Sequence, residues 1–337
     1  MEIRKIQVTG AGDTRIISLP KDWAARHQLD KGSNVVIKEM SSGELLIYPT
    51  EIPVEKRITR IKESAHVSRD VLAAYLLGSD VIIIESTKDT PLQKKSVIRD
   101  LSRQLVGLEI LGETQESIEL HFLIDSSSLP NPREYVHRCF SIANQMQSDA
   151  ISAFINDDIT LAEEVIERDV EVNRLYFLIV RMLKIMVNDK REISNIKPTT
   201  CLDWRMVAAY GENLGDASVD FATTVKKNQN MKSTLAKSSL NKIKKLSSLI
   251  TMALAESLDS FFAGDVLAAE ELKHRIDNQL KNIHKEIQED ISKHDKEVVS
   301  KLTSLISFLG QLREVAIDIG DLVIANDTSL NGHYLKD

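Results

Sequence analysis

Three carboxylates recur at intervals of four residues within the segment 210–222, and they are the side chains of this chain best suited to binding a ligand. Glu212, Asp216 and Asp220 would share one slowly turning face of a helix. Like charges at this spacing repel by about 0.2–0.5 kcal/mol per pair. A helix that keeps them is expected to have a cation or a basic group nearby. The alternative interpretation is a solvated acidic stripe.

The composition predicts a helix-rich protein of several domains. The chain has 337 residues, of which 42% are hydrophobic, enough for two or three packed domains. Charged residues make up 28% and aromatic residues 5%, which favours helices. Cys139 and Cys201 are the only cysteines and form no CxxC pair, so neither a disulfide framework nor a zinc knuckle is expected.

Hydropathy and charge indicate a cytoplasmic chain. No apolar run approaches the ~20 residues of a membrane span, and the N-terminus lacks the apolar core of a signal peptide. The formal net charge of −7 argues against a globally basic nucleic-acid coat but leaves room for one small DNA-binding face.

Residues 1–52 are expected to form a small β-rich module. Ile3–Val8 alternates apolar and polar side chains, a glycine turn follows at 9–13, and Arg15–Leu19 reads as a second strand. Pro20 precedes a short helix, and two further strands form a hairpin around 41–44. A segment this small buries little core alone, so we expect it to pair with a second copy.

This pattern resembles the swapped-hairpin DNA-binding domain of the AbrB/MazE/SpoVT family. The resemblance rests on the first two strands, the glycine turn, Leu19-Pro20-Lys21 and the turn from Leu29 through Gly32 to Val35. It implies a homodimer with interleaved strands, in which Arg4, Lys5 and Arg15 face DNA. Ala24 and Ala25 stand where members often carry arginines, and the charges of the module nearly balance. Dimerisation without DNA binding is therefore the alternative.

Residues 53–128 are expected to form an α/β connector domain of the order β-α-β-α-β-β. A boundary falls at 51–53, and residues 81–84 are four consecutive branched apolar side chains, typical of a strand buried on both faces. The segment has no phosphate loop and no nucleophile motif. Residues 126–132 form a linker.

The rest of the chain predicts two related three-helix bundles, at 133–228 and 235–328. The segment 158–165 matches 265–272 in sequence, with a phenylalanine ahead of each and an arginine behind each, which indicates a duplicated unit. Long helices joined by short loops form antiparallel bundles. His274 and His284 share a helix in the second unit, and we expect both at the surface.

The bundles resemble the PhoU family of phosphate-uptake regulators, in the archaeal type of arrangement. The resemblance rests on Glu-Asn-Leu-Gly-Asp-Ala-Ser-Val-Asp-Phe-Ala at 212–222 and on the segments 146–150 and 165–169. It implies a multinuclear metal site. Carboxylate-rich sites suit iron, manganese, magnesium or calcium, with zinc possible. In the first bundle the ligands would be Asp169, Asn173, Glu212, Asp216 and Asp220, and a weaker second site would use Glu314 and Asp318.

The chain is therefore expected to be mainly α with a β-rich N-terminus, and to act as a regulator. In the first hypothesis a PhoU-like sensor bundle controls a dimeric head that binds DNA upstream of phosphate-related genes. In the second, the chain is a dimeric adaptor that docks on a phosphate ABC transporter ATPase or a sensor kinase. A carboxylate-bridged metalloenzyme is disfavoured because no Glu-x-x-His pair lies beside the acids.

Overall fold

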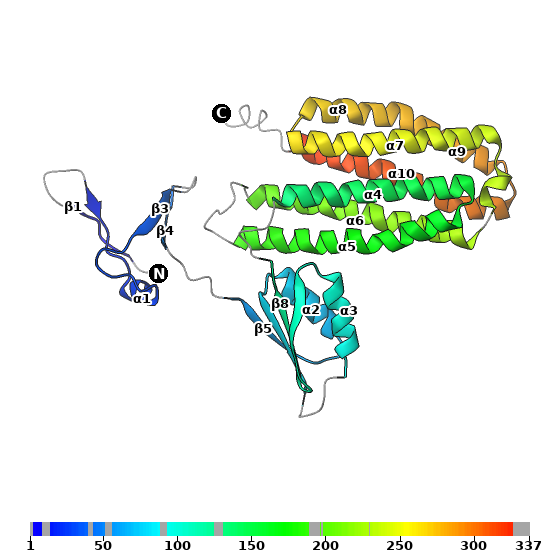
Figure 1. Ribbon diagram of the computed structural model, residues 1–337. Coiled ribbons are helices and arrows are strands. Elements are labelled where there is room, and N and C mark those ends of the chain that lie inside the picture. The colour runs from blue at the N-terminus through cyan, green and yellow to red at the C-terminus, as the bar shows by residue number, and fades with distance from the viewer. Residues whose placement is uncertain are drawn as a thin grey trace. The chain divides into compact units, whose positions relative to one another are not determined.

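The computed structural model divides into two units, residues 1–56 and 57–337, each described here by itself (Figure 1). The predicted turn at 9–13, the boundary at 51–53 and the linker residues 126–130 lie outside the described residues. The structure describes residues 3–8, 14–39, 43–50, 56–87, 93–124, 131–188, 196, 198–228 and 230–325.

The N-terminal unit consists of two short hairpins and one helical turn-and-a-half. Strands β1 (Gln7–Val8) and β2 (Arg15–Ile16) pair antiparallel, helix α1 (Lys21–Arg26) follows Pro20, and β3 (Val35–Glu39) pairs with β4 (Leu45–Pro49). The elements come in the predicted order, but β1 and β2 are two residues long, shorter than the predicted strands.

This unit has almost no core of its own. Pro49 is the one buried residue among its described residues. Seven large apolar side chains stay exposed, by 43% at the least. Apolar surface of this extent is usually covered by another chain. The seven are Ile3, Ile6, Val8, Ile16, Ile17, Ile37 and Leu45.

An α/β domain opens the second unit, with the predicted order of elements. Its strands are β5 (Ile58–Lys62), β6 (Val81–Glu85), β7 (Leu108–Glu113) and β8 (Ser117–Phe122), and they lie in the order β5-β6-β8-β7. Strand β5 is parallel to β6, and the other pairs are antiparallel. Helices α2 (Val67–Leu76) and α3 (Lys95–Gln104) contribute to the core beneath the sheet.

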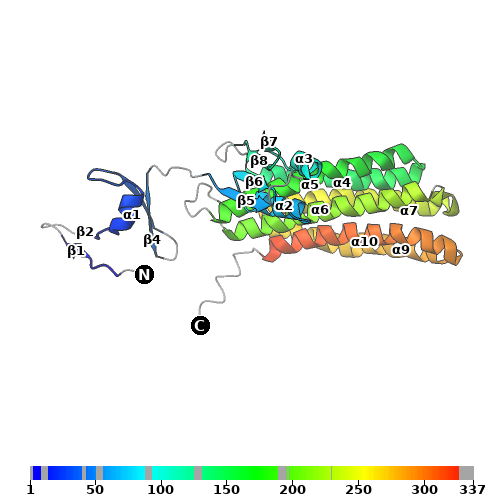
Figure 2. The same ribbon diagram turned by 90° about the horizontal axis from the view of Figure 1, so that it is seen from below.

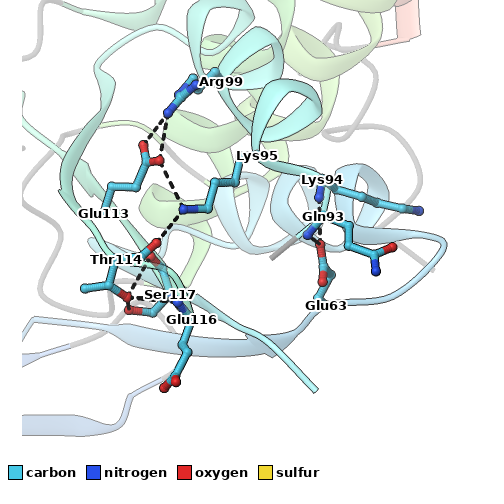
Figure 3. Close-up of polar contacts among 9 residues, drawn as sticks. All are labelled: Glu63, Gln93, Lys94, Lys95, Arg99, Glu113, Thr114, Glu116 and Ser117. Atoms are coloured by element: carbon cyan, nitrogen blue, oxygen red, sulfur yellow. Dashed lines mark hydrogen bonds and ion pairs between the residues drawn. The ribbon is translucent and has the colours of Figure 1, made fainter. Parts of the chain in front are cut away.

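Two carboxylates fasten α3 to the sheet (Figure 3). Glu63 Oε1 accepts hydrogen bonds from the backbone N–H groups of Gln93 and Lys94, at 2.9 and 2.8 Å, and so satisfies donors ahead of the helix. On β7, Glu113 lies 3.3 Å from Lys95 Nζ and 2.7 Å from Arg99 Nη2. These contacts hold the start of α3 and its first turns against the sheet.

Six long helical stretches form two adjacent bundles (Figures 1 and 2). The first contains α4 (Pro132–Asn156), α5 (Ile159–Asn188) and α6 (Pro198–Lys227). The second contains η1 (Met231–Thr234), α7 (Lys237–Ala263), α8 (Val266–Arg275), the π-turn η2 (Ile276–Leu280), α9 (Lys281–Ser292) and α10 (Lys296–Ala325). One hydrophobic core runs through both, and the rings of Phe221 and Phe308 stack across the boundary at 4.7 Å.

Helix α7 is long and apolar enough to cross a membrane by length and composition alone. Its apolar stripe, which includes Ile243, Ile250 and Leu254, is buried in the bundle core. In this structure the helix is therefore a core helix.

The duplication predicted from 158–165 and 265–272 is visible at the start of the second helix of each bundle. Asp158 Oδ1 accepts from the N–H of Leu161, and Asp265 Oδ1 accepts from the N–H of Ala268, both at 3.0 Å. These are equivalent N-caps. The residue before each cap has a left-handed backbone, with φ 54° and 65°.

A buried arginine joins the α/β domain to helix α5. Arg181, 1% exposed, donates from Nη1 to the carbonyls of Tyr75 at 2.7 Å and Ser79 at 3.0 Å. Its guanidinium lies 3.8 Å from the ring centroid of Phe122 and 3.7 Å from Asp80. Burial lowers the pKa of Arg181 to about 10, so the group stays charged at neutral pH.

Candidate functional sites: an acidic helix face and a basic N-terminal hairpin

The carboxylates singled out in the first bundle come together on neighbouring helices. Asp169 and Asn173 lie one turn apart on α5, and Asn173 Nδ2 donates to Asp169 Oδ2 at 2.6 Å. Glu212, Asp216 and Asp220 lie at successive turns of α6. Gly215 lets the two helices approach, because a Cβ there would stand 3.2 Å from Val172 and 3.7 Å from Asp169 Oδ1. The acids therefore occupy one interhelical face.

The pKa shifts of these acids indicate electrostatic repulsion among them. Burial raises the pKa of Asp169, and the charge of Asp216 raises it further. Glu212 has its pKa raised by burial and then by Asp216 and Asp169, while Arg205 opposes the shift. The pKa of Asp216 is raised by burial and by Asp220. Asp169, Glu212 and Asp216 are thus more easily protonated than isolated carboxyl groups.

A basic neighbour of the kind expected from the spacing is present. Arg205, two turns before Glu212 on α6, lies with its guanidinium 4.8 Å from the ring centroid of Tyr176 on α5. Its charge is the one that favours ionised Glu212. A single positive charge offsets only part of the repulsion among the four carboxylates of Asp169, Glu212, Asp216 and Asp220.

The side chains on this face are of the types that bind a hard cation, but their arrangement does not form a binding site. Carboxylate and amide oxygens suit such ions, and Asp169 Oδ1 is buried without a hydrogen-bond partner. Yet among the described residues no three His, Cys, Asp or Glu side chains converge closely enough to hold a metal ion. The acids are therefore neighbours, but they do not form a preassembled metal site.

The second bundle replaces this face with apolar side chains. The repeat aligns Ile276 and Leu280 with the α5 ligand positions, and both are buried, while Asp277 is exposed. The π-turn at 276–280 adds one residue to this part of the helix, and Asp277 within it lies one residue after the aligned acid position. On α10, Glu314 and Asp318 lie one turn apart. Burial, Glu314 and Asp321 raise the pKa of Asp318.

The expectation for His284 was wrong, whereas His274 is exposed as expected. His284 is 8% exposed, and its Nε2 is buried without a hydrogen-bond partner. A Cβ on Gly310 would stand 3.2 Å from its ring, so the imidazole fills the space above that glycine. Burial and Arg313 lower the pKa of His284. The π-turn at 276–280 precedes His284 and rotates the later part of the helix relative to a regular α-helix.

Replacing Asp216 with asparagine is expected to stabilise the fold at neutral pH by about 0.5 kcal/mol, because it relieves like-charge repulsion. Carboxyl groups whose folded pKa is raised contribute stability below the ordinary carboxyl pKa of about 4, and this contribution is lost as pH rises through the raised value. The gain from Asp216→Asn should therefore shrink between pH 7 and pH 4.5 in urea denaturation. Asp259→Asn, at an exposed position on α7, is the control. A gain independent of pH would contradict the coupling.

The basic residues predicted to face DNA are all exposed on the first hairpin or just before it. Arg4 Nη1 donates to Ser18 Oγ at 3.3 Å, which links the segments before β1 and after β2. Arg15 lies in β2 opposite Val8. Lys5 precedes β1 and is solvent-exposed. The three side chains are thus exposed to solvent.

Two family models match the chain. The model described as PhoU domain matches residues 136–225, which are helices α4 to α6. The model described as antidote-toxin recognition MazE, bacterial antitoxin, matches residues 11–55. Curated proteins gave no match.

Two solved structures are similar to the chain. The crystal structure of PhoU from Pseudomonas aeruginosa has a TM-score of 0.50 and 18% identity, and the match covers 57% of this chain and 93% of that one. The phosphate transport system regulatory protein PhoU from Streptococcus pneumoniae has a TM-score of 0.49 and 15% identity, covering 58% and 95%. The first likeness shows the fold. The chain therefore contains a PhoU domain in its first helical bundle, preceded by a MazE-type segment.

Proposed function

We propose that this protein is a cytoplasmic phosphate-homeostasis regulator, in which a MazE-type head binds DNA as a homodimer and the PhoU-like bundles receive the signal. The observation that carries the proposal is the combination, in one chain, of a MazE-type segment without a core and a separately packed PhoU-like unit. No catalytic step is assigned to any residue.

The apolar surface of residues 1–56 supports the proposed dimerisation. One half of an interleaved dimer, taken alone, would expose the apolar side chains that its partner covers. Residues 1–56 expose seven aliphatic side chains around two small antiparallel strand pairs, as such a half would. Burial of apolar area contributes about 25 cal/mol per Å², so a second copy would supply the missing core. A dimer would also present two sets of Arg4, Lys5 and Arg15 to one duplex.

Replacing Arg15 with alanine is expected to weaken DNA binding and flatten its salt dependence. Each phosphate contact contributes about 0.9 to the slope of log K against log salt, so a dimer that loses one contact per copy should lose about 2 from the slope. Arg4→Ala should behave alike. Fluorescence anisotropy over a salt series measures the slope, with Arg26→Ala on α1 as the control. An unchanged slope in both variants would remove these residues from the interface.

The acidic face of the first bundle is proposed as the regulated element. Among the described residues no three acidic side chains converge on one point, so a divalent or iron-type cation would bind there only after the acidic side chains rearrange. A ligand regulates only if it binds two states of the protein with different affinity. Calorimetric titration with manganese, compared between the native chain and Asp216→Asn, tests whether these acids take part.

The second candidate function is a dimeric adaptor that docks through its bundles on a phosphate-transporter ATPase or a sensor kinase. The observation favouring it is the near balance of acidic and basic side chains in residues 1–56. DNA affinity comes mainly from phosphate contacts, and three basic residues per copy are few. A dimer with no detectable DNA binding at low salt would support the adaptor.

A further inference from the structure

The seam between the two bundles contains a polar pocket that the proposed function does not use. Helices α4 and α7 lie side by side (Figure 1). A pocket with a volume of about 350 Å³ lies between them. That lies at the lower end of the range for small-molecule sites, about 300–1,000 Å³. Helix α4 lines it with Ser148, Ile151, Ser152, Ile155 and Asn156, and α7 with Lys244, Ser247, Ser248, Thr251 and Met252.

The lining has the chemistry of an anion site. It contains four serine hydroxyls, one amide and one ammonium group, and no carboxylate. This is unusual for a chain with a net charge of −7. A fifth hydroxyl, that of Thr251, already donates to the carbonyl of Ser247. Hydroxyls and an ammonium donate hydrogen bonds to the oxygens of a phosphate or a carboxylate, and charge-assisted bonds of this kind are the strong ones.

The serine hydroxyls at the pocket wall differ in exposure. Ser247 is 6% exposed, whereas Ser148 and Ser152 are half-buried and Ser248 is exposed. All four line the pocket, so a ligand there would lie within reach of hydroxyl donors from both helices.

The basic character extends along α7 beyond the pocket. Residues 226–245 contain seven lysines, and no acidic residue occurs between Asp220 and Glu256. Lys226, Lys232 and Lys242 are used in ion pairs with Glu163, Asp157 and Asp290. Lys237 and Lys244 lie two turns apart on one face of α7, and neither forms an ion pair among the described residues.

A rigid floor holds the pocket in shape. Gln147, fully buried on α4, donates from Nε2 to Thr251 Oγ1 at 2.6 Å, and Asn144 Nδ2 donates to the Thr251 carbonyl at 3.1 Å. Gln147 Oε1 is buried without a partner behind this floor. These hydrogen bonds link α4 to α7 beside the pocket.

We propose that the α4–α7 pocket binds a small oxyanion ligand, either inorganic phosphate or a phosphate group on a small hydroxyl-bearing molecule. Lys244 pairs with the anionic oxygens, and the serine hydroxyls of both helices donate to them. The ligand therefore contacts both bundles and stabilises their present packing. The inference rests on the seam alone and does not depend on DNA or metal binding elsewhere in the chain.

Isothermal titration of the full chain in phosphate-free buffer at low ionic strength tests the proposal. The probes are inorganic phosphate, glucose 6-phosphate and, as the uncharged control, glucose. Saturable binding of inorganic phosphate identifies the free anion as sufficient, whereas binding of glucose 6-phosphate alone identifies a phosphomonoester, and either result supports the site. Saturation by neither phosphate compound would overturn it.

Matched variants place the binding in the pocket. Lys244→Gln should weaken binding about tenfold, the loss of one charge-assisted contact, while Lys245→Gln, at the next residue outside the pocket, should stay within about twofold. Ser152→Val fills the pocket without changing charge and should also abolish binding. Equal losses in the two lysine variants would show non-specific attraction to α7 and overturn the proposal. Circular dichroism confirms that each variant is folded.

Discussion

Replacing Arg181 with methionine should destabilise the second unit by about 3 kcal/mol, because removing one partner of a buried charged network leaves the others unpaired. Methionine keeps much of the volume but donates nothing to the Tyr75 and Ser79 carbonyls. It also leaves Asp80 beside the partly exposed Arg57 alone. The measurement is urea denaturation of the full chain, followed by circular dichroism.

Arg60→Met is the control, because it removes an arginine that is exposed rather than buried. Arg60 pairs with Glu85 at 2.7 Å, but its side chain is 64% exposed, so the change should cost less than about 1 kcal/mol. Limited proteolysis adds a second readout, since Arg181→Met should make the α/β domain more easily cleaved. If the two variants lose equal stability, Arg181 does not hold the domain to α5.

The second large effect is expected from Gly78→Ala at the same junction. Gly78 has φ +89°, which costs an alanine about 1 kcal/mol. Its new Cβ would stand 2.8 Å from Ile185 Cγ1 and 3.0 Å from Arg57 Nη1. Displacing Ile185 on α5 adds about 1–2 kcal/mol, for a total of about 2–3 kcal/mol in the same urea experiment.

Gly264→Ala separates backbone strain from the clash. Gly264 also has a positive φ, +65°, but no atom lies within 4 Å of the position its Cβ would take. Its substitution should cost about 1 kcal/mol only. The difference between the two variants measures how tightly the α/β domain packs on α5. If the two variants lose the same free energy of unfolding, Ile185 moves aside at no cost and the α/β domain is not tightly packed on α5.

Local patterns were enough to predict most of the fold. The order β-α-β-α-β-β follows from apolar runs and turn residues, and the duplicated caps at Asp158 and Asp265 follow from a repeated sequence. The acidic stripe at Glu212 to Asp220 depends only on helical spacing. These features are set by neighbours in the sequence, so a single chain displays them.

Long-range contacts explain what could not be predicted. Arg181 stands in an apolar run of α5, and its partners come from a turn about a hundred residues away. His284 becomes buried because a π-turn shifts the register of its helix. The serines of the α4–α7 pocket are unremarkable on either helix and become a site only when the helices meet. The sequence predicts that the acids of α5 and α6 face each other, but it does not predict that no three of the described acidic side chains converge on a metal position.

DNA binding by the MazE-type head is the central claim, and anisotropy of labelled DNA from upstream of phosphate-transport genes tests it most directly. The full chain is compared with residues 57–337, which retain both buried cores, across a salt series. The account predicts saturable, salt-dependent binding by a full-length dimer, and a truncated monomer that does not bind. No binding by the full-length dimer at low salt would contradict it and leave residues 1–56 as a dimerisation element.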